Sequence, residues 1–177
     1  MPALTQADIR RLFDLLNEEL GASKTRGELY LVGGAVMCLA YNARPSTADV
    51  DALFQPSAEV RKAAARAAAK SGFPADWLND SVKAYLSERF DFAPFLELDH
   101  LKVLVAEPKY LLAMKCLAMR IGAEFHDLDD VRFLLRLLDI RSYDQAIAII
   151  NKYYPFDRFP QKTLYALQEL LPTSSEQ

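Results

Sequence analysis

Two aspartates separated by one valine, Asp49 and Asp51, are the residues of this chain whose type and spacing most suggest chemistry. The segment "ADVDALF" alternates, which predicts a strand with Val50 on an apolar face and both carboxylates on the opposite face. At a rise of roughly 3.3 Å per residue, the two acids would lie about 6–7 Å apart and repel each other unless a cation lies between them. Carboxylates with open positions for phosphate favour Mg²⁺, or Mn²⁺ in its place. The alternative is a solvated acidic face of a strand.

A glycine pair, Gly33-Gly34, follows the apolar run "LYLV", which we interpret as a buried strand. The next residues, "AVMCLAYNA", predict a helix, so the glycines would let backbone N–H groups approach a phosphate at its start. The pair is neither a Walker loop nor a dinucleotide-binding fingerprint, because no Lys-Ser/Thr follows it and no Gly-x-Gly-x-x-Gly is present. A plain turn is the alternative. Together the pieces fit one site, with the glycines for a triphosphate and the acids for its metal.

This arrangement resembles the nucleotidyltransferase superfamily, which has the DNA polymerase beta-like fold. The match covers Val32-Gly33-Gly34 and Asp49-Val50-Asp51. The intervening "ARPSTADVD" is similar to the abortive-infection type branch, whose toxin members pair with an antitoxin. The resemblance implies nucleotide binding by Gly33, Gly34 and Thr47. It also implies that Asp49 and Asp51 bind the metal and act in catalysis.

A second block, "EPKYLLAMKCLAMR" followed by "HDLDDVRFLL", is similar to another motif of that branch. The resemblance implies that Lys115 contacts the nucleotide phosphates and that Arg120 also binds the nucleotide. It implies catalytic roles for Asp127 and Asp130, one of which would complete the site. From the residues alone, Lys115 could equally extend to solvent. The two aspartates, three residues apart on one helix face, could simply stabilise a helix start through its dipole.

Many members of the superfamily carry a third carboxylate on a later strand. The nearest matches here are Glu97 and Asp99, and the other source is the helix pair Asp127 and Asp130. His126 stands where the branch often has Arg or Lys.

The predicted elements give an α/β (α+β) fold with a small mixed β-sheet of the nucleotidyltransferase type packed by helices. Residues 1–106 would form the core with an N-terminal helix, and residues 107–177 would form a helical region that completes the site, both within one compact unit. Helices are predicted at 5–20, 35–43, 56–72, 108–122, 126–140, 142–154 and 160–171, with a loop and short helix within 74–88. Strands are predicted at 29–32, 48–54, 95–98 and 101–107, the last two as a hairpin.

Composition and charge limit the function classes. The net charge of −3 argues against a general polyanion binder, although it leaves room for a local basic groove. Cys38 and Cys116 lie in apolar helical contexts, which predicts two buried thiols in a reducing compartment. No apolar run reaches the roughly 20 residues that span a bilayer. We therefore expect a cytoplasmic protein without membrane association.

The expected function is a metal-dependent transfer of a nucleoside monophosphate from a nucleoside triphosphate to an acceptor hydroxyl. The acceptor would be an RNA end, a protein or a small molecule, and an antitoxin is the partner that the toxin branch implies. The alternative is a weakly active or inactive module on the same fold that binds a nucleotide or a protein as a regulator. A domain without any nucleotide site ranks last, because two spaced motifs would then coincide by chance.

Overall fold

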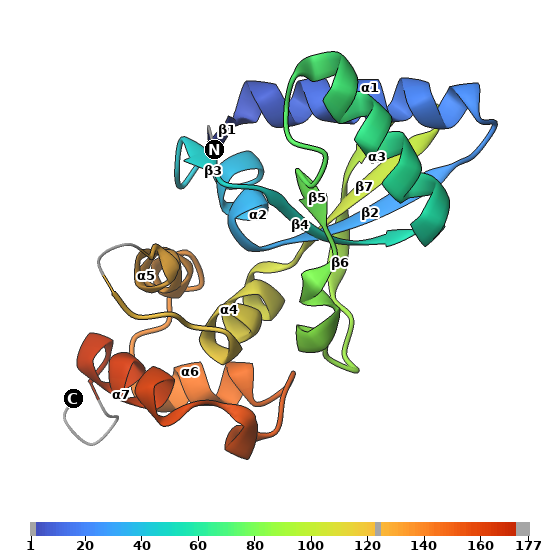
Figure 1. The fold of residues 1–177 in the computed structure, drawn as a ribbon. Helices are drawn as coiled ribbons and strands as arrows, with labels where there is room; N and C mark the ends of the chain where they lie inside the picture. Colours follow the sequence, from blue (N-terminus) through green and yellow to red (C-terminus); the bar gives the residue numbers. More distant parts are fainter. Residues whose placement is uncertain (1–2, 123–124, 173–177) are drawn as a thin grey trace. The chain divides into compact units, whose positions relative to one another are not determined.

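The computed structural model describes residues 3–122 and 125–172, which form an α+β fold (Figure 1). The chain divides into two compact units. The first comprises Met1–Ala84 and Phe92–Ala106, and the second comprises Tyr85–Asp91 and Glu107–Gln177. The predicted division after residue 106 falls at the same place as one of these boundaries. Tyr85–Asp91, however, belongs with the helical second unit.

The first unit is built on a five-stranded mixed sheet in the order β5-β4-β2-β7-β6. Strand β2 is antiparallel to β4 and parallel to β7, while β4 is parallel to β5 and β6 is antiparallel to β7. A separate two-stranded sheet pairs β1 with β3. The strands span Leu4–Thr5 (β1), Gly27–Val32 (β2), Ser46–Thr47 (β3), Val50–Gln55 (β4), Leu78–Asn79 (β5), Phe92–Glu97 (β6) and Leu101–Ala106 (β7).

Alternating burial in the three central strands gives the sheet one apolar face. The register aligns Leu29 of β2 with Phe54 of β4 and with Val103 of β7, and all three side chains are buried. Helices α1 (Gln6–Ala22) and α3 (Ser57–Ser71) lie side by side against the sheet (Figure 1). The apolar stripe of α1 is fully buried; its members are Ile9, Leu12, Phe13, Leu16 and Leu20.

The ends of these helices follow from local sequence. Thr5 caps α1 through a capping box, in which its hydroxyl accepts from the Asp8 N–H and the Asp8 carboxylate accepts from the Thr5 N–H. Gly72 ends α3 in the left-handed conformation (φ 81°), as a terminal glycine commonly does. The short helix α2 (Gly33–Leu39) connects β2 to the β3–β4 region.

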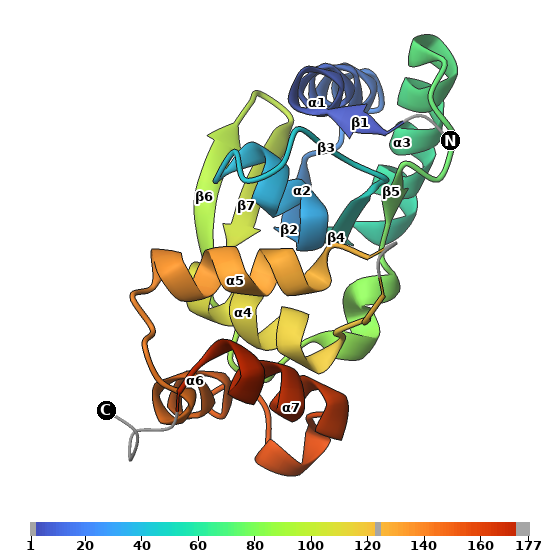
Figure 2. The same cartoon turned by 90° about the vertical axis from the view of Figure 1, so that its left-hand side faces the viewer.

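The second unit is helical, with α4 packed against α5 and α6 (Figure 2). Its elements are α4 (Pro108–Leu117), α5 (Asp127–Leu137), α6 (Tyr143–Ile150), the 3₁₀ turn η2 (Phe156–Arg158) and α7 (Gln161–Leu170). Ser142 caps α6, because its hydroxyl accepts from the Gln145 N–H. The side chain of Gln145 accepts from the Arg141 N–H at 2.8 Å.

Several predicted elements differ in their bounds; the strand predicted at 95–98 spans Phe92–Glu97, for example, and the helix predicted at 142–154 ends at Ile150. The helix predicted at 35–43 already begins at Gly33 and ends at Leu39. The helix predicted to reach Gly122 ends at Leu117, because the carboxylate of Asp127 accepts the backbone N–H of Arg120 in the turn that follows. Within 74–88 the strand β5 follows the predicted loop, and the predicted short helix is the 3₁₀ turn η1 (Ser81–Tyr85).

Both cysteines are free and buried, as predicted. Burial raises the pKa of the Cys38 thiol, and it raises the pKa of Cys116 to about 12, so both thiols stay protonated. Among the helices in the described ranges, none combines the length and apolar character that crossing a membrane requires.

Candidate functional site

The glycine pair lies beside Asp51 because of the register between β2 and β4. This register pairs Val32, the last residue of β2, with Asp51. Gly33 then turns the chain with a φ of +68°, a conformation that L side chains rarely adopt. A Cβ atom at Gly33 would lie 3.1 Å from Oδ2 of Asp51. Glycine is therefore required here both by the backbone and by the closeness of the carboxylate.

Gly34 is the point where the start of α2 approaches the β3 region. A Cβ atom at this position would lie 2.6 Å from Oγ1 of Thr47 and 3.1 Å from the guanidinium carbon of Arg44. Thr47 is buried, and its short branched side chain has little room to move away. The absence of a side chain at Gly34 thus allows Thr47 and Arg44 to close against the helix.

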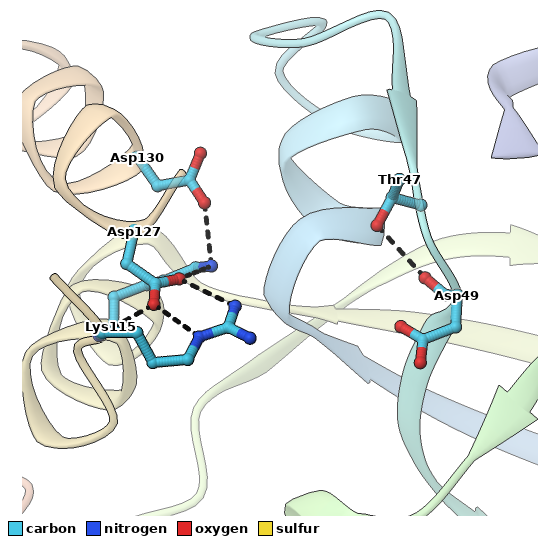
Figure 3. A network of polar contacts seen from close by, with 6 residues as sticks. Thr47, Asp49, Lys115, Asp127 and Asp130 are labelled. Atoms are coloured by element: carbon cyan, nitrogen blue, oxygen red, sulfur yellow. Dashed lines mark hydrogen bonds and ion pairs between the residues drawn. The ribbon is translucent and has the colours of Figure 1, made fainter. Parts of the chain in front are cut away.

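Asp49 does not lie in the strand, which corrects the prediction of a strand over 48–54. Strand β4 begins at Val50, because β2 ends opposite Asp51 and Gly33 turns the backbone away, so the β2 ladder does not continue to Asp49. Asp49 is instead held by local bonds. Its carbonyl oxygen accepts from the Thr47 hydroxyl at 3.2 Å (Figure 3), and its Oδ2 accepts from Nδ2 of Asn79 at 2.8 Å.

This part of the first unit brings oxygen ligands together with the guanidinium of Arg44, which lies at Gly34 beside Thr47. Asp49 and Asp51 supply two partly buried carboxylates, and Thr47 supplies a hydroxyl. Such hard donors suit Mg²⁺ or Mn²⁺ rather than a soft transition metal. Within residues 3–122 and 125–172, no group of three or more His, Cys, Asp or Glu side chains is arranged to hold a metal ion.

The second unit brings together the four residues of the second sequence motif. Nζ of Lys115 lies 2.8 Å from Oδ2 of Asp130 and 3.3 Å from Oδ1 of Asp127 (Figure 3). Arg120 binds the other oxygen of Asp127 through both its backbone N–H and its Nε, each at 2.9 Å. The interpretation of Lys115 as a solvent-exposed side chain is wrong, since only 11% of that side chain is exposed.

Burial and charge act in opposite directions on Asp127. Burial alone raises the pKa of its carboxyl group, but the hydrogen bonds from Arg120 and the positive charge of Lys115 together hold the pKa below its ordinary value. Asp127 is also the first residue of α5, where a negative charge is favourable. The ionised form is thus the stable one, which gives this cluster a clear structural role. Its predicted catalytic and nucleotide-binding roles stay predictions.

Other residues that the sequence singled out have local explanations. Glu97, at the end of β6, forms an exposed ion pair with Arg26 at 2.8 Å. His126 is the residue before α5, and its side chain does not cap the helix. The guanidinium of Arg120 lies over the ring of Phe125, 4.6 Å from its centroid.

Sequence reasoning missed two residues of the first unit, Arg44 and Asn79. Arg44 lies within the "ARPSTADVD" segment that carried the resemblance, so its position before Thr47 was an available signal. Asn79 follows an apolar Trp-Leu pair in a segment expected to be loop and helix, and nothing in its spacing connects it to Asp49. Only the pairing of β5 with β4 brings it there.

Comparisons of this chain with protein-family models, with curated proteins and with solved structures found no match. A function is therefore inferred from the chain's own residues and geometry.

Proposed function

We propose that this protein is a metal-dependent nucleotidyltransferase that moves a nucleoside monophosphate from a nucleoside triphosphate to an acceptor hydroxyl. The observation that carries the proposal is the approach of the Gly33 backbone to the Asp51 carboxylate, fixed by the β2–β4 register. Asp49 lies one residue before the same strand and is held by Thr47 and Asn79. A triphosphate that binds with its metal needs backbone N–H groups for the phosphates and carboxylates for the metal, and a glycine pair beside two acids would supply both.

Asp49 and Asp51 are the residues that would hold Mg²⁺ or Mn²⁺. Their oxygen donors fit a hard cation, and the repulsion between two neighbouring carboxylates is relieved when a cation binds. When bound, the metal neutralises charge on the phosphates and on the leaving group.

The residues of the chain supply positioning and proton transfer. Thr47 holds the Asp49 backbone through the carbonyl bond, and the missing side chains at Gly33 and Gly34 let Asp51 and Thr47 approach the backbone of the glycine pair. In the reaction, the acceptor oxygen forms a bond to the α-phosphorus, the bond from that phosphorus to the β-phosphate oxygen breaks, and pyrophosphate leaves. Asp51 takes up the proton of the acceptor hydroxyl. Catalysis of this kind depends chiefly on alignment and charge stabilisation.

The acceptor belongs to one of three classes: an RNA end, a protein side chain or a small molecule. If the chain acts as a toxin, we propose that an antitoxin protein is its partner. The alternative, an inactive regulator on the same fold, makes a different prediction, because it would bind a nucleotide or a protein without transferring label.

Two measurements test the proposed function. Calorimetry with each nucleoside triphosphate, with and without Mg²⁺, should show metal-dependent binding that Asp51→Asn abolishes. Incubation with α-labelled triphosphates and total cell RNA and protein should label one fraction, and both Asp49→Asn and Asp51→Asn should reduce that labelling roughly 100-fold or more. The matched control is Asp76→Asn, an exposed acid of the same unit.

The control variant should behave as the wild type in both measurements. Binding without transfer would favour the regulator. The site assignment is wrong if the wild type binds no triphosphate in the presence of metal, or if labelling survives the change at Asp51.

A further inference from the structure

The shortest strand of the five-stranded sheet, β5, brings an amide to the acidic pair. β5 is parallel to β4, and its register pairs Leu78 with Val50 and Asn79 with Asp51. Asn79 is therefore the direct neighbour of one acid along the sheet, and its Nδ2 donates to Oδ2 of the other acid, Asp49, at 2.8 Å. One residue thus lies next to both carboxylates.

The orientation of the Asn79 amide is fixed from its other side. Its Oδ1 accepts from the Ser81 hydroxyl at 2.8 Å and from the Ser81 backbone N–H at 3.3 Å. Because the oxygen is used by Ser81, the NH₂ group faces Asp49. A flipped amide would lose both bonds to Ser81 and turn an oxygen toward a carboxylate.

The strand that carries Asn79 is itself anchored. Trp77 is 2% exposed, and its indole N–H donates to the carbonyl oxygen of Ala64 in α3 at 2.9 Å. The carbonyl oxygen of Trp77 accepts from the Val50 N–H at 2.8 Å, which ties β5 to the start of β4. Asn79 is therefore held by rigid elements rather than by a free loop.

We propose that Asn79 is a positioning residue that orients the Asp49 carboxylate toward a divalent cation, an inference that rests on the proposed function. A hydrogen bond to one carboxylate oxygen fixes the plane of the group and so the direction in which it can coordinate. A neutral amide does this without cancelling the charge, whereas Lys or Arg would compete with the cation. Partners of this kind typically contribute 10- to 100-fold in metal affinity.

The test measures Mn²⁺ binding to the full chain without any nucleotide. Electron paramagnetic resonance of free Mn²⁺ and calorimetry each give the affinity. Asn79→Ala should weaken Mn²⁺ binding about 10-fold or more. Ser81→Ala removes one of the two bonds that orient the amide, so its effect should have the same direction and be smaller. The matched control is Asn17→Ala, which also removes an asparagine hydrogen bond in the first unit, to the His100 N–H, and should leave the affinity unchanged.

Thermal unfolding of each variant separates positioning from a general loss of structure. The inference is supported if Asn79→Ala and Ser81→Ala lower the affinity while unfolding as cooperatively as Asn17→Ala. If Asn79→Ala does not fold, the Ser81→Ala result decides. Unchanged Mn²⁺ affinity in Asn79→Ala, with binding by the wild type, overturns the inference and leaves the proposed function standing. A wild type that binds no Mn²⁺ without nucleotide overturns the inference, and the calorimetry with triphosphate and metal then decides the proposed function separately.

Discussion

Lys115 illustrates how a single residue can satisfy a motif and a structural need at once. Its ammonium group lies between Asp127 and Asp130, and all three side chains are largely buried. A buried charge is costly unless it is paired, and here one cation has two anionic partners, with Arg120 adding a second cation at Asp127. The cluster joins the end of α4 to the start of α5. It therefore stabilises the second unit whether or not Lys115 also meets a nucleotide.

The lowered pKa of Asp127 predicts a pH dependence of stability that Asp127→Asn should remove. Because the folded-state pKa lies below the ordinary 3.8, this carboxylate stabilises the fold above that pH and loses its contribution as the pH falls through the lowered pKa. Asp127→Asn should cost about 1–3 kcal/mol at pH 7, the range for hydrogen bonds to charged groups. Its cost should shrink below about pH 4. Urea unfolding between pH 7 and pH 3 measures both effects.

Asp129→Asn is the control for that measurement, since Asp129 lies on the same turn with a side chain that is 71% exposed. It should unfold almost as the wild type does at every pH. Parallel pH curves for Asp127→Asn and the wild type would contradict the prediction.

At the residue scale, the sequence predicted which residues share a helix face better than it predicted which side chains form hydrogen bonds with each other. The three-residue spacing of Asp127 and Asp130 indicated a shared helix face, and both do meet Lys115. The partner of Asp49 was out of reach, because Asn79 arrives through a parallel strand pairing 30 residues along the chain. Such a pairing depends on the whole sheet and leaves no periodic signal near either residue.

At the scale of elements, the order β2–α2–β4 and the hairpin of β6 and β7 were predictable from the sequence. The strand at the other edge of the sheet, β5, was not. The apolar run "LYLV" indicated β2 and the alternation in "ADVDALF" indicated β4. The helices predicted to start at Thr5 and Ser142 and to end at Gly72 have those ends within one residue of the prediction. A two-residue strand such as β5 is too short to show a periodic pattern in the sequence. Its place is fixed by the burial of Trp77 against Phe13, whose ring centroid lies 6.4 Å from that of Trp77.

Trp77→Phe should therefore weaken the edge strand that carries Asn79. The change removes the hydrogen bond to Ala64 and leaves space in the core, and we expect a loss of about 1–3 kcal/mol in the free energy of unfolding. Urea unfolding followed by circular dichroism measures it. Phe156→Leu, at a 46% exposed position, should change stability by less than about 0.5 kcal/mol. A Trp77→Phe protein as stable as the wild type would contradict the role of Trp77 as an anchor.

For the whole molecule, the chain passes between the two units three times, after Ala84, Asp91 and Ala106. Composition and helix patterns predicted the helical character of the second unit. They gave no sign that Tyr85–Asp91 belongs to it, because that assignment depends on distant tyrosines. The hydroxyl of Tyr154 donates to the Tyr85 carbonyl oxygen, and the hydroxyl of Tyr153 donates to the Asp91 carboxylate.

These two hydroxyls should govern how readily the Tyr85–Asp91 segment opens. In the full chain, Tyr153→Phe combined with Tyr154→Phe removes both bonds while keeping the rings, including the stacking of Tyr153 on Tyr110. At about 1 kcal/mol for each of the two bonds, trypsin should cleave after Arg89 roughly 30-fold faster under native conditions. Tyr165→Phe, at a 61% exposed position in α7, is the control and should cleave at the wild-type rate. Equal cleavage rates in all three proteins would mean that contacts other than these hydroxyls hold the segment to the second unit.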